Sequence, residues 1–283
     1  MKIKADNSHW KFWRAPHLDD LELLCGSNIT HEYPPHVHEE YCVLLMLKGV
    51  EVTVCRGVTH SALPGSLGLM NPDEVHSSRS VGAEYRIIRI RPNSFRRIVS
   101  ESAGRDLGTL HFTKLVVDDA PIFRSLLNLH LKLEQNISSL EQESEFVSTM
   151  GAFVSRHLGN YPAPRPAGRE PRHVKTIRDY LKSHYAENVS LSQLTSITNL
   201  SPFYLLRVFH NQVGFPPHEY QTQVRIAHAR KLLLEGQPIS HVALETGFCD
   251  QSHLSRNFKR IVGMTPGQFS SQSKIVQDPT RRV

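Results

Sequence analysis

The most constraining feature of this 283-residue chain is an internal repeat in its C-terminal part. The segment that begins at Leu191 (LSQLTSITNLSPFYLLRVFHNQVGFPPHEY) aligns with the one that begins at Ile239 (ISHVALETGFCDQSHLSRNFKRIVGMTPGQF). Each copy predicts a short helix, a turn at Asn199 or Gly247 where a left-handed backbone is tolerated, and a second helix. Two helix-turn-helix units are therefore expected, each with a second helix that can enter the major groove of DNA.

Flanking residues complete these two units. Ser201 and Asp250 precede the two second helices and are good N-cap residues. Pro217–Leu234 is predicted to be a helix that joins the units, and Arg172–His184 a helix that completes the first. A structural helical hairpin without a ligand, as in solenoids, is the alternative. The presence of only two copies weighs against it.

Charge is distributed unevenly along the chain. Residues 1–170 carry 19 Lys/Arg and 20 Asp/Glu, whereas residues 171–283 carry 14 and 7. A basic part beside a neutral part is typical of a module that binds polyanions, although a solvated basic face has the same composition.

A proline-rich segment marks the domain boundary. Residues 160–171 (NYPAPRPAGREP) contain four prolines and almost no apolar side chain, which predicts an extended linker. We expect an effector-binding and dimerisation domain over residues 1–160, a linker over 161–171, a DNA-binding domain over 172–272 and a flexible tail over 273–283.

The N-terminal part combines β and helical patterns. Short apolar runs between Tyr41 and Pro92, broken by Gly, Pro or Asn, predict a β-sandwich or barrel. Two helices are expected after it, one preceded by Asp119 and one by Ser138 with Glu141 as a capping box. Their apolar stripes could cover the barrel or form a subunit interface; they are Ile122, Leu126, Leu129, Leu133 and Val147, Met150, Val154, Leu158. The predicted fold class is α+β with two domains.

Other classes of protein are disfavoured. No apolar run is long enough to cross a bilayer, and Met1–Trp13 lacks the apolar core of a signal peptide. The four cysteines have no CxxC spacing, which argues against a zinc ribbon or a disulfide scaffold and favours the reduced cytoplasm. We find no motif for nucleophilic catalysis or phosphate binding.

The repeat resembles the paired helix-turn-helix domain of the AraC/XylS family of bacterial transcription regulators. The resemblance lies in SPFYLLRVFHNQVGFPPHEY, in ARKLL at Ala229–Leu233, in Ile239–Cys249 and in SHLSRNFKRIVGMTPGQF. It implies two recognition helices in successive major-groove segments, roughly 34 Å apart.

The resemblance also implies which residues contact DNA. The candidates for base contact are Phe203, Leu206, Arg207, Gln251, Ser252, Ser255 and Arg256, and those for phosphate contact are Lys259 and Arg260. Arginine and glutamine suit guanine and adenine edges. Phe203 and Leu206 could contact only thymine methyl groups, or they could pack inside the unit.

Two further segments, PPHVHEEYCVLLMLKG and LPGSLGLMNPDEVH, resemble the halves of a cupin barrel motif, as in sensor domains of this family. The implied effector-binding residues are His36, His38, Glu40, Tyr41 and His76. The first three alternate, so on a strand they would share one face, and Tyr41 is a candidate for the rim. Three imidazoles and a carboxylate could hold a divalent metal. However, the glutamates follow His38 immediately, unlike the later carboxylate of metal-binding cupins.

We therefore expect a polar small-molecule effector rather than a metal, with histidines that only hydrogen-bond within the barrel as a further alternative. The predicted function is a transcription regulator without catalytic activity or cofactor, whose partners are promoter DNA, the effector, a second copy in a homodimer and RNA polymerase. The alternative is a metal-dependent cupin dioxygenase or isomerase with an accessory basic domain.

Overall fold

The computed structural model describes residues 8–107, 110–135, 137–158, 168 and 170–277. The chain divides into two compact units. We call Met1–Glu134 with Phe146–Arg165 the sheet unit, and Gln135–Glu145 with Pro166–Val283 the helical unit. Most of the predicted linker, residues 161–167 and 169, lies outside the described residues.

The sheet unit is built on one antiparallel sheet. Its strands are β1 (His9–Ala15), β2 (Leu21–His36), β3 (Tyr41–Cys55), β4 (Val58–Ala62), β5 (Leu67–Met70), β6 (His76–Ile90) and β7 (Val116–Val117), with a short 3-10 helix, η1 (Pro16–Leu18), after β1. The pairing order is β1-β2-β6-β3-β5-β7, and β4 pairs with β3. The predicted β region begins at Tyr41. The sheet begins earlier in the chain, because β1 and β2 precede Tyr41.

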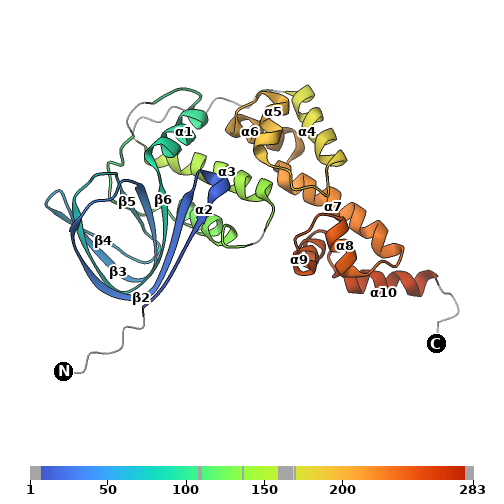
Figure 1. Cartoon of the computed structure of the whole chain (residues 1–283), viewed down its shortest axis with the longest axis horizontal. Helices are drawn as coiled ribbons and strands as arrows, with labels where there is room; N and C mark the ends of the chain where they lie inside the picture. Colours follow the sequence, from blue (N-terminus) through green and yellow to red (C-terminus); the bar gives the residue numbers. More distant parts are fainter. Residues whose placement is uncertain (1–7, 108–109, 136, 159–167, 169, 278–283) are drawn as a thin grey trace, which may run out of the picture. The chain divides into compact units, whose positions relative to one another are not determined.

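The sheet is curled like a barrel (Figure 1). Among the described strands, β1 and β7 stand at the two ends of the pairing order, so hydrogen bonds do not close the barrel that the sequence predicts. A cluster of buried side chains fills the inner face of the sheet: Ile29, Met46, Ala62, Ala83 and Tyr85. This face also holds a buried polar pair, in which the Ser80 hydroxyl donates to the Glu51 carboxylate.

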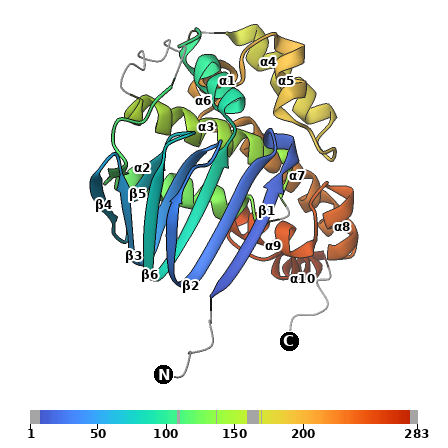
Figure 2. The same cartoon turned by 60° about the vertical axis from the view of Figure 1, so that its left-hand side comes forward.

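Helices α2 (Ala120–Lys132) and α3 (Ser139–His157) correspond to the two predicted helices. The Asp119 carboxylate accepts a hydrogen bond from the Ile122 backbone N–H at 3.2 Å. The Ser138 hydroxyl accepts one from the Glu141 N–H at 3.3 Å. α2 packs against the outer side of the sheet (Figure 2).

The apolar stripes of α2 and α3 are buried within the chain itself, except for half-buried Val147. This favours covering of the sheet over a subunit interface. A further helix, α1 (Pro92–Ala103), follows β6 and was not predicted. Its buried residues Phe95, Ile98, Val99 and Ser102 recur at helical spacing, which is the signal that sequence analysis overlooked.

The helical unit contains the predicted repeat. Its helices are α4 (Pro171–Ser183), α5 (Leu191–Thr198), α6 (Pro202–Val213), α7 (Pro217–Leu234), α8 (Ile239–Glu245), α9 (Gln251–Val262) and α10 (Pro266–Gln277). The α5–α6 and α8–α9 pairs are the two copies. α7 has the predicted bounds, whereas α10 runs past Gln272 into the stretch predicted to be a tail.

Local interactions define the turns of the two copies. Asn199 and Gly247 have φ values of 54° and 78°, so both turns use the left-handed backbone that was predicted. The Asp250 carboxylate accepts a hydrogen bond from the His253 N–H at 2.6 Å, as expected of an N-cap. Ser201 occupies the N-cap of α6, but its side chain makes no capping hydrogen bond.

Buried Arg225 joins α7 to the segment between α4 and α5. Its Nε donates to the Tyr185 carbonyl at 2.7 Å, and a terminal nitrogen donates to the Glu187 carbonyl at 2.9 Å. Burial lowers the pKa of Arg225 to about 10, so it stays charged at neutral pH. No helix among the described residues is long and apolar enough to cross a membrane.

Candidate DNA-binding surface and effector pocket

Helix α9 exposes a polar and basic face. Gln251, Ser252 and Arg256 are exposed, and Ser255 is half-buried. They form two adjacent pairs that lie four residues apart, 251–252 and 255–256, which places them on one side of the helix. The opposite side packs into the core through Leu254 and Phe258.

Lys259 and Arg260 are also exposed, in the last turn of α9. Arg260 lies 3.6 Å from the Glu219 carboxylate, and both groups are solvent-accessible, so this pair contributes little to stability. The structure therefore leaves all the predicted residues of α9 except Ser255 largely accessible.

Helix α6 differs from the prediction. Phe203 and Leu206 are only 6% and 5% exposed, so they pack inside the unit and are not available for thymine methyl groups. Nothing in their spacing distinguished a buried stripe from an apolar reading face. Arg207 is half-buried, and its Nε has no hydrogen-bond partner among the described residues.

Sequence analysis did not select two exposed residues of α6, His210 and Asn211. The register that equates Arg207 with Arg256 also equates them with Lys259 and Arg260. Applying this register to the phosphate candidates would have identified both residues.

Three of the predicted effector residues meet at one end of the sheet. His36 ends β2 and is the register partner of His76 at the start of β6, while His38 lies in the connection from β2 to β3. The ring centroids are 4.3 Å apart for His36 and His76, and 4.8 Å apart for His38 and His76. One ring nitrogen from each histidine lies within 4.8 Å of those of the other two.

Backbone carbonyls orient two of these rings. The Nδ1 atom of His36 is 2.8 Å from the Pro34 carbonyl oxygen, and that of His76 is 2.9 Å from the Glu74 carbonyl oxygen. Because a carbonyl only accepts, Nδ1 carries the proton in both rings and Nε2 keeps its lone pair.

Burial disfavours the charged forms of His38 and His76. Burial is the main reason that the pKa of His38 is lowered to about 4, and the positive charges of His76 and Arg89 add to the effect. Burial also lowers the pKa of His76. The His38 Nδ1 atom is buried and has no hydrogen-bond partner among the described residues.

The other two predicted effector residues lie elsewhere. Strand β2 ends at His36, so the alternation does not continue to Glu40, whose side chain lines a separate pocket with Glu39 and Arg91. Tyr41 is buried rather than at the rim. Its hydroxyl donates to the Leu110 carbonyl at 2.8 Å, and its ring packs 4.5 Å from that of Phe95.

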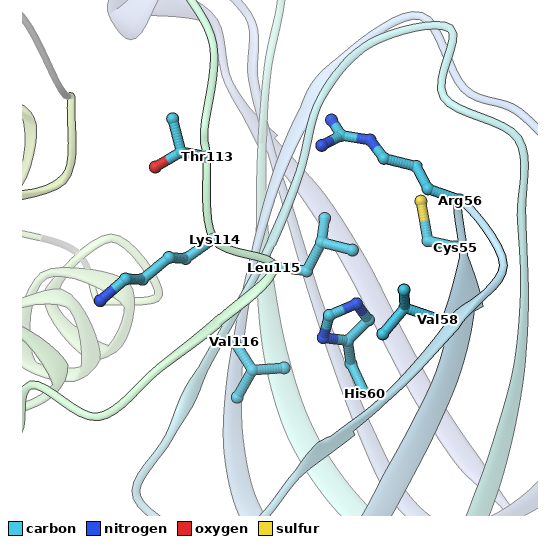
Figure 3. Close-up of a pocket in the computed structure, with 8 residues that line it drawn as sticks. All are labelled: Cys55, Arg56, Val58, His60, Thr113, Lys114, Leu115 and Val116. Carbon is cyan, nitrogen blue, oxygen red and sulfur yellow. The ribbon is translucent and has the colours of Figure 1, made fainter.

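A pocket of about 370 Å³ lies beside the histidine cluster, a size within the range of small-molecule sites. It is lined by Cys55, Arg56, Val58, His60, Thr113, Lys114, Leu115 and Val116. Figure 3 shows His60, Leu115 and Val116 directed toward one another, whereas the Lys114 side chain points away. Cys55 on β3 is the register partner of His76, which places this pocket next to the cluster.

Charge in the pocket comes mainly from Arg56. Its guanidinium pairs with the Glu74 carboxylate and lies 2.7 Å from Nε2 of His111. Glu74 also accepts from the Asn71 amide at 3.1 Å. Sequence analysis missed Arg56 and His60, because the β3–β4 hairpin carries no motif that separates pocket residues from surface residues.

Comparison with known proteins gives two family matches. Residues 20–149 match the AraC-like ligand binding domain, and residues 194–272 match the helix-turn-helix domain. These ranges correspond to the sheet-based domain and to the repeat.

The chain is similar to named regulators. It is 33% identical over 243 residues to the uncharacterized HTH-type transcriptional regulator YbfI of Bacillus subtilis. The alignment covers 84% of this chain and 87% of YbfI. It is 30% identical over 146 residues to the probable transcriptional regulator LumQ of Photobacterium leiognathi, covering 51% of this chain and 57% of LumQ.

A third relative matches only part of the chain. The bifunctional transcriptional activator/DNA repair enzyme AdaA of Bacillus subtilis is 30% identical over 103 residues, covering 36% of this chain and 49% of AdaA. The extensive match to YbfI and the two domain matches together show that this chain belongs to the AraC family of transcriptional regulators, with a ligand-binding and a DNA-binding domain.

Proposed function

We propose that α6 and α9 read two successive segments of promoter DNA. In α9, Gln251, Ser252, Ser255 and Arg256 would face base edges, with Lys259 and Arg260 on phosphates. In α6, Arg207 would contact a base, and His210 and Asn211 would contact the backbone. The observation that carries this proposal is the accessible polar face of α9 opposite its buried side.

We propose that the effector binds in the sheet unit, in the pocket beside His36, His38 and His76. A buried polar atom without a partner is costly, so His38 Nδ1, together with the charge of Arg56, favours a polar small molecule over a wholly apolar one. The apolar side chains of Val58, Leu115 and Val116 would pack against its carbon skeleton.

The effector would act by shifting the population between states with different affinity for DNA. We also propose that the chain forms a homodimer, that it contacts RNA polymerase and that it acts in the cytoplasm. The stripes of α2 and α3 that suggested the dimer are buried in the chain and give it no further support. We also propose that the chain is not an enzyme, in keeping with its extensive similarity to a regulator.

The test is footprinting of the full chain on chromosomal fragments, repeated with polar metabolites such as sugars and carboxylates. We expect protected sites whose occupancy changes with one metabolite. The double variant His38→Ala/His76→Ala should bind the same sites and lose the response, whereas His9→Ala, at the exposed start of β1, should keep both. A normal response in the double variant would show that these histidines do not contribute to sensing.

A further inference from the structure

The three histidines present the donor set of a metal site. His36 and His38 lie two residues apart around the end of β2, whereas His76 begins β6, and their ring nitrogens gather within 4.8 Å of one another. Hydrogen bonds from Nδ1 of His36 and His76 to backbone carbonyls are the outer contacts that commonly orient metal-binding imidazoles. They leave both Nε2 lone pairs free to coordinate, and His38 adds the unpartnered Nδ1.

We propose that His36, His38 and His76 bind one divalent transition-metal ion, and that the effector is a small anion that completes its coordination. Imidazole suits Zn, Ni, Fe and Cu and not Ca or Mg. Metal–nitrogen bonds of about 2.0–2.1 Å bring ligand atoms to about 3.4 Å from one another, so small side-chain rotations close the site.

The anionic effector follows from the ligand group itself, which among the described residues contains three histidines and no carboxylate. The Glu39 and Glu40 side chains line the pocket next to Arg91, and the Glu74 carboxylate bonds to Asn71 and Arg56. Imidazole coordinates a metal in its neutral form, so three such ligands leave the ion its double charge and at least one open position. A carboxylate or similar anion fits this position better than a neutral sugar.

This inference rests on the proposed effector site but not on DNA binding. The test uses the full chain, treated with a chelator and then titrated with Co(II). We expect one ion per chain and visible absorption bands typical of nitrogen-coordinated cobalt. His38→Gln and His76→Ala should each weaken binding by more than about 100-fold, and His9→Ala should leave it unchanged.

Failure of wild-type protein to bind Co(II), or equal binding by the triple variant His36→Ala/His38→Ala/His76→Ala, would overturn the metal site. The wild-type titration decides the matter even where a variant folds poorly. Azide added to the cobalt form should shift its absorption bands by occupying the open position, and an unchanged spectrum would overturn the anionic effector. The DNA affinity of the metal-free chain is measured in parallel. It tests the proposed DNA binding independently of the metal site.

Discussion

Arg207 on α6 and Arg256 on α9 occupy the same position in the two repeats, yet Arg256 is exposed and Arg207 is half-buried. Near Arg207, Phe203 and Leu206 are apolar where the second copy has Ser252 and Ser255. The second copy therefore offers more polar groups to a base edge. We expect it to contribute more of the sequence specificity than the first.

Arg256→Ala should remove a base contact. We expect a loss of about 1–3 kcal/mol of binding free energy at the preferred site and relaxed preference at one base position. The measurement is fluorescence anisotropy with cognate and unrelated duplexes. Arg172→Ala, which removes an exposed arginine from the start of α4, is the charge-matched control. Equal weakening on both duplexes by Arg256→Ala would show that this side chain contacts only phosphates.

Lys259→Ala and Arg260→Ala should weaken binding to all duplexes alike. A phosphate contact releases condensed counterions and carries no sequence information, so each variant should reduce the slope of log affinity against log salt by about 1. Titrations at several salt concentrations measure this slope. A change of preferred sequence with an unaltered slope would reassign these residues to base contacts.

Gly247→Ala should destabilise the helical unit more than Gly214→Ala. Both glycines have positive φ, at 78° and 89°, so alanine is strained by about 1 kcal/mol at either position. At Gly247 a Cβ would also overlap the Ala186 carbonyl oxygen, whereas at Gly214 it would meet open space. We expect roughly 3 kcal/mol or more in total for Gly247→Ala. Thermal melting followed by circular dichroism compares the two, and equal melting temperatures would contradict the close approach.

His130 should make the stability of the sheet unit depend on pH. It is fully buried, its Nδ1 accepts from Arg86 at 2.8 Å, and burial is the main cause that lowers its pKa to about 4. The unfolded chain takes up this proton near pH 6.5 and the folded chain does not, so stability is full above pH 6.5 and falls toward pH 4.

Between pH 7 and 5 this histidine should cost about 2 kcal/mol of unfolding free energy. His130→Gln should flatten the pH profile by that amount. Denaturation followed by tryptophan fluorescence isolates the sheet unit, because Trp10 and Trp13 both lie in β1. Parallel pH profiles for wild type and variant would show that His130 does not titrate as proposed.

The helical unit could be predicted closely because local signals agree there. The repeat located the two helix pairs, and Asn199, Gly247 and Asp250 marked their turns and a cap. Burial was harder to predict, since Phe203 and Leu206 have the spacing of both a packed stripe and an apolar reading face. Only the packing against the rest of the unit separates the two.

The effector site was predicted in part for a physical reason. His36 and His76 meet through strand pairing, as the resemblance to a cupin motif implied. Glu40 and Tyr41 diverge because β2 ends at His36, and the end of a strand depends on pairing between distant segments rather than on local alternation. Arg56 and His60 lie on the local β3–β4 hairpin, but they line a pocket only because the distant residues Leu115 and Val116 lie beside them, and no local signal identified them.

The most direct test is selection of preferred sites by the full chain from random DNA duplexes. The account predicts enrichment of two blocks of fixed bases about one helical turn apart, with Arg256→Ala relaxing one position in one block only. Enrichment of no shared sequence, or of sites that Arg256→Ala leaves unchanged, would contradict it.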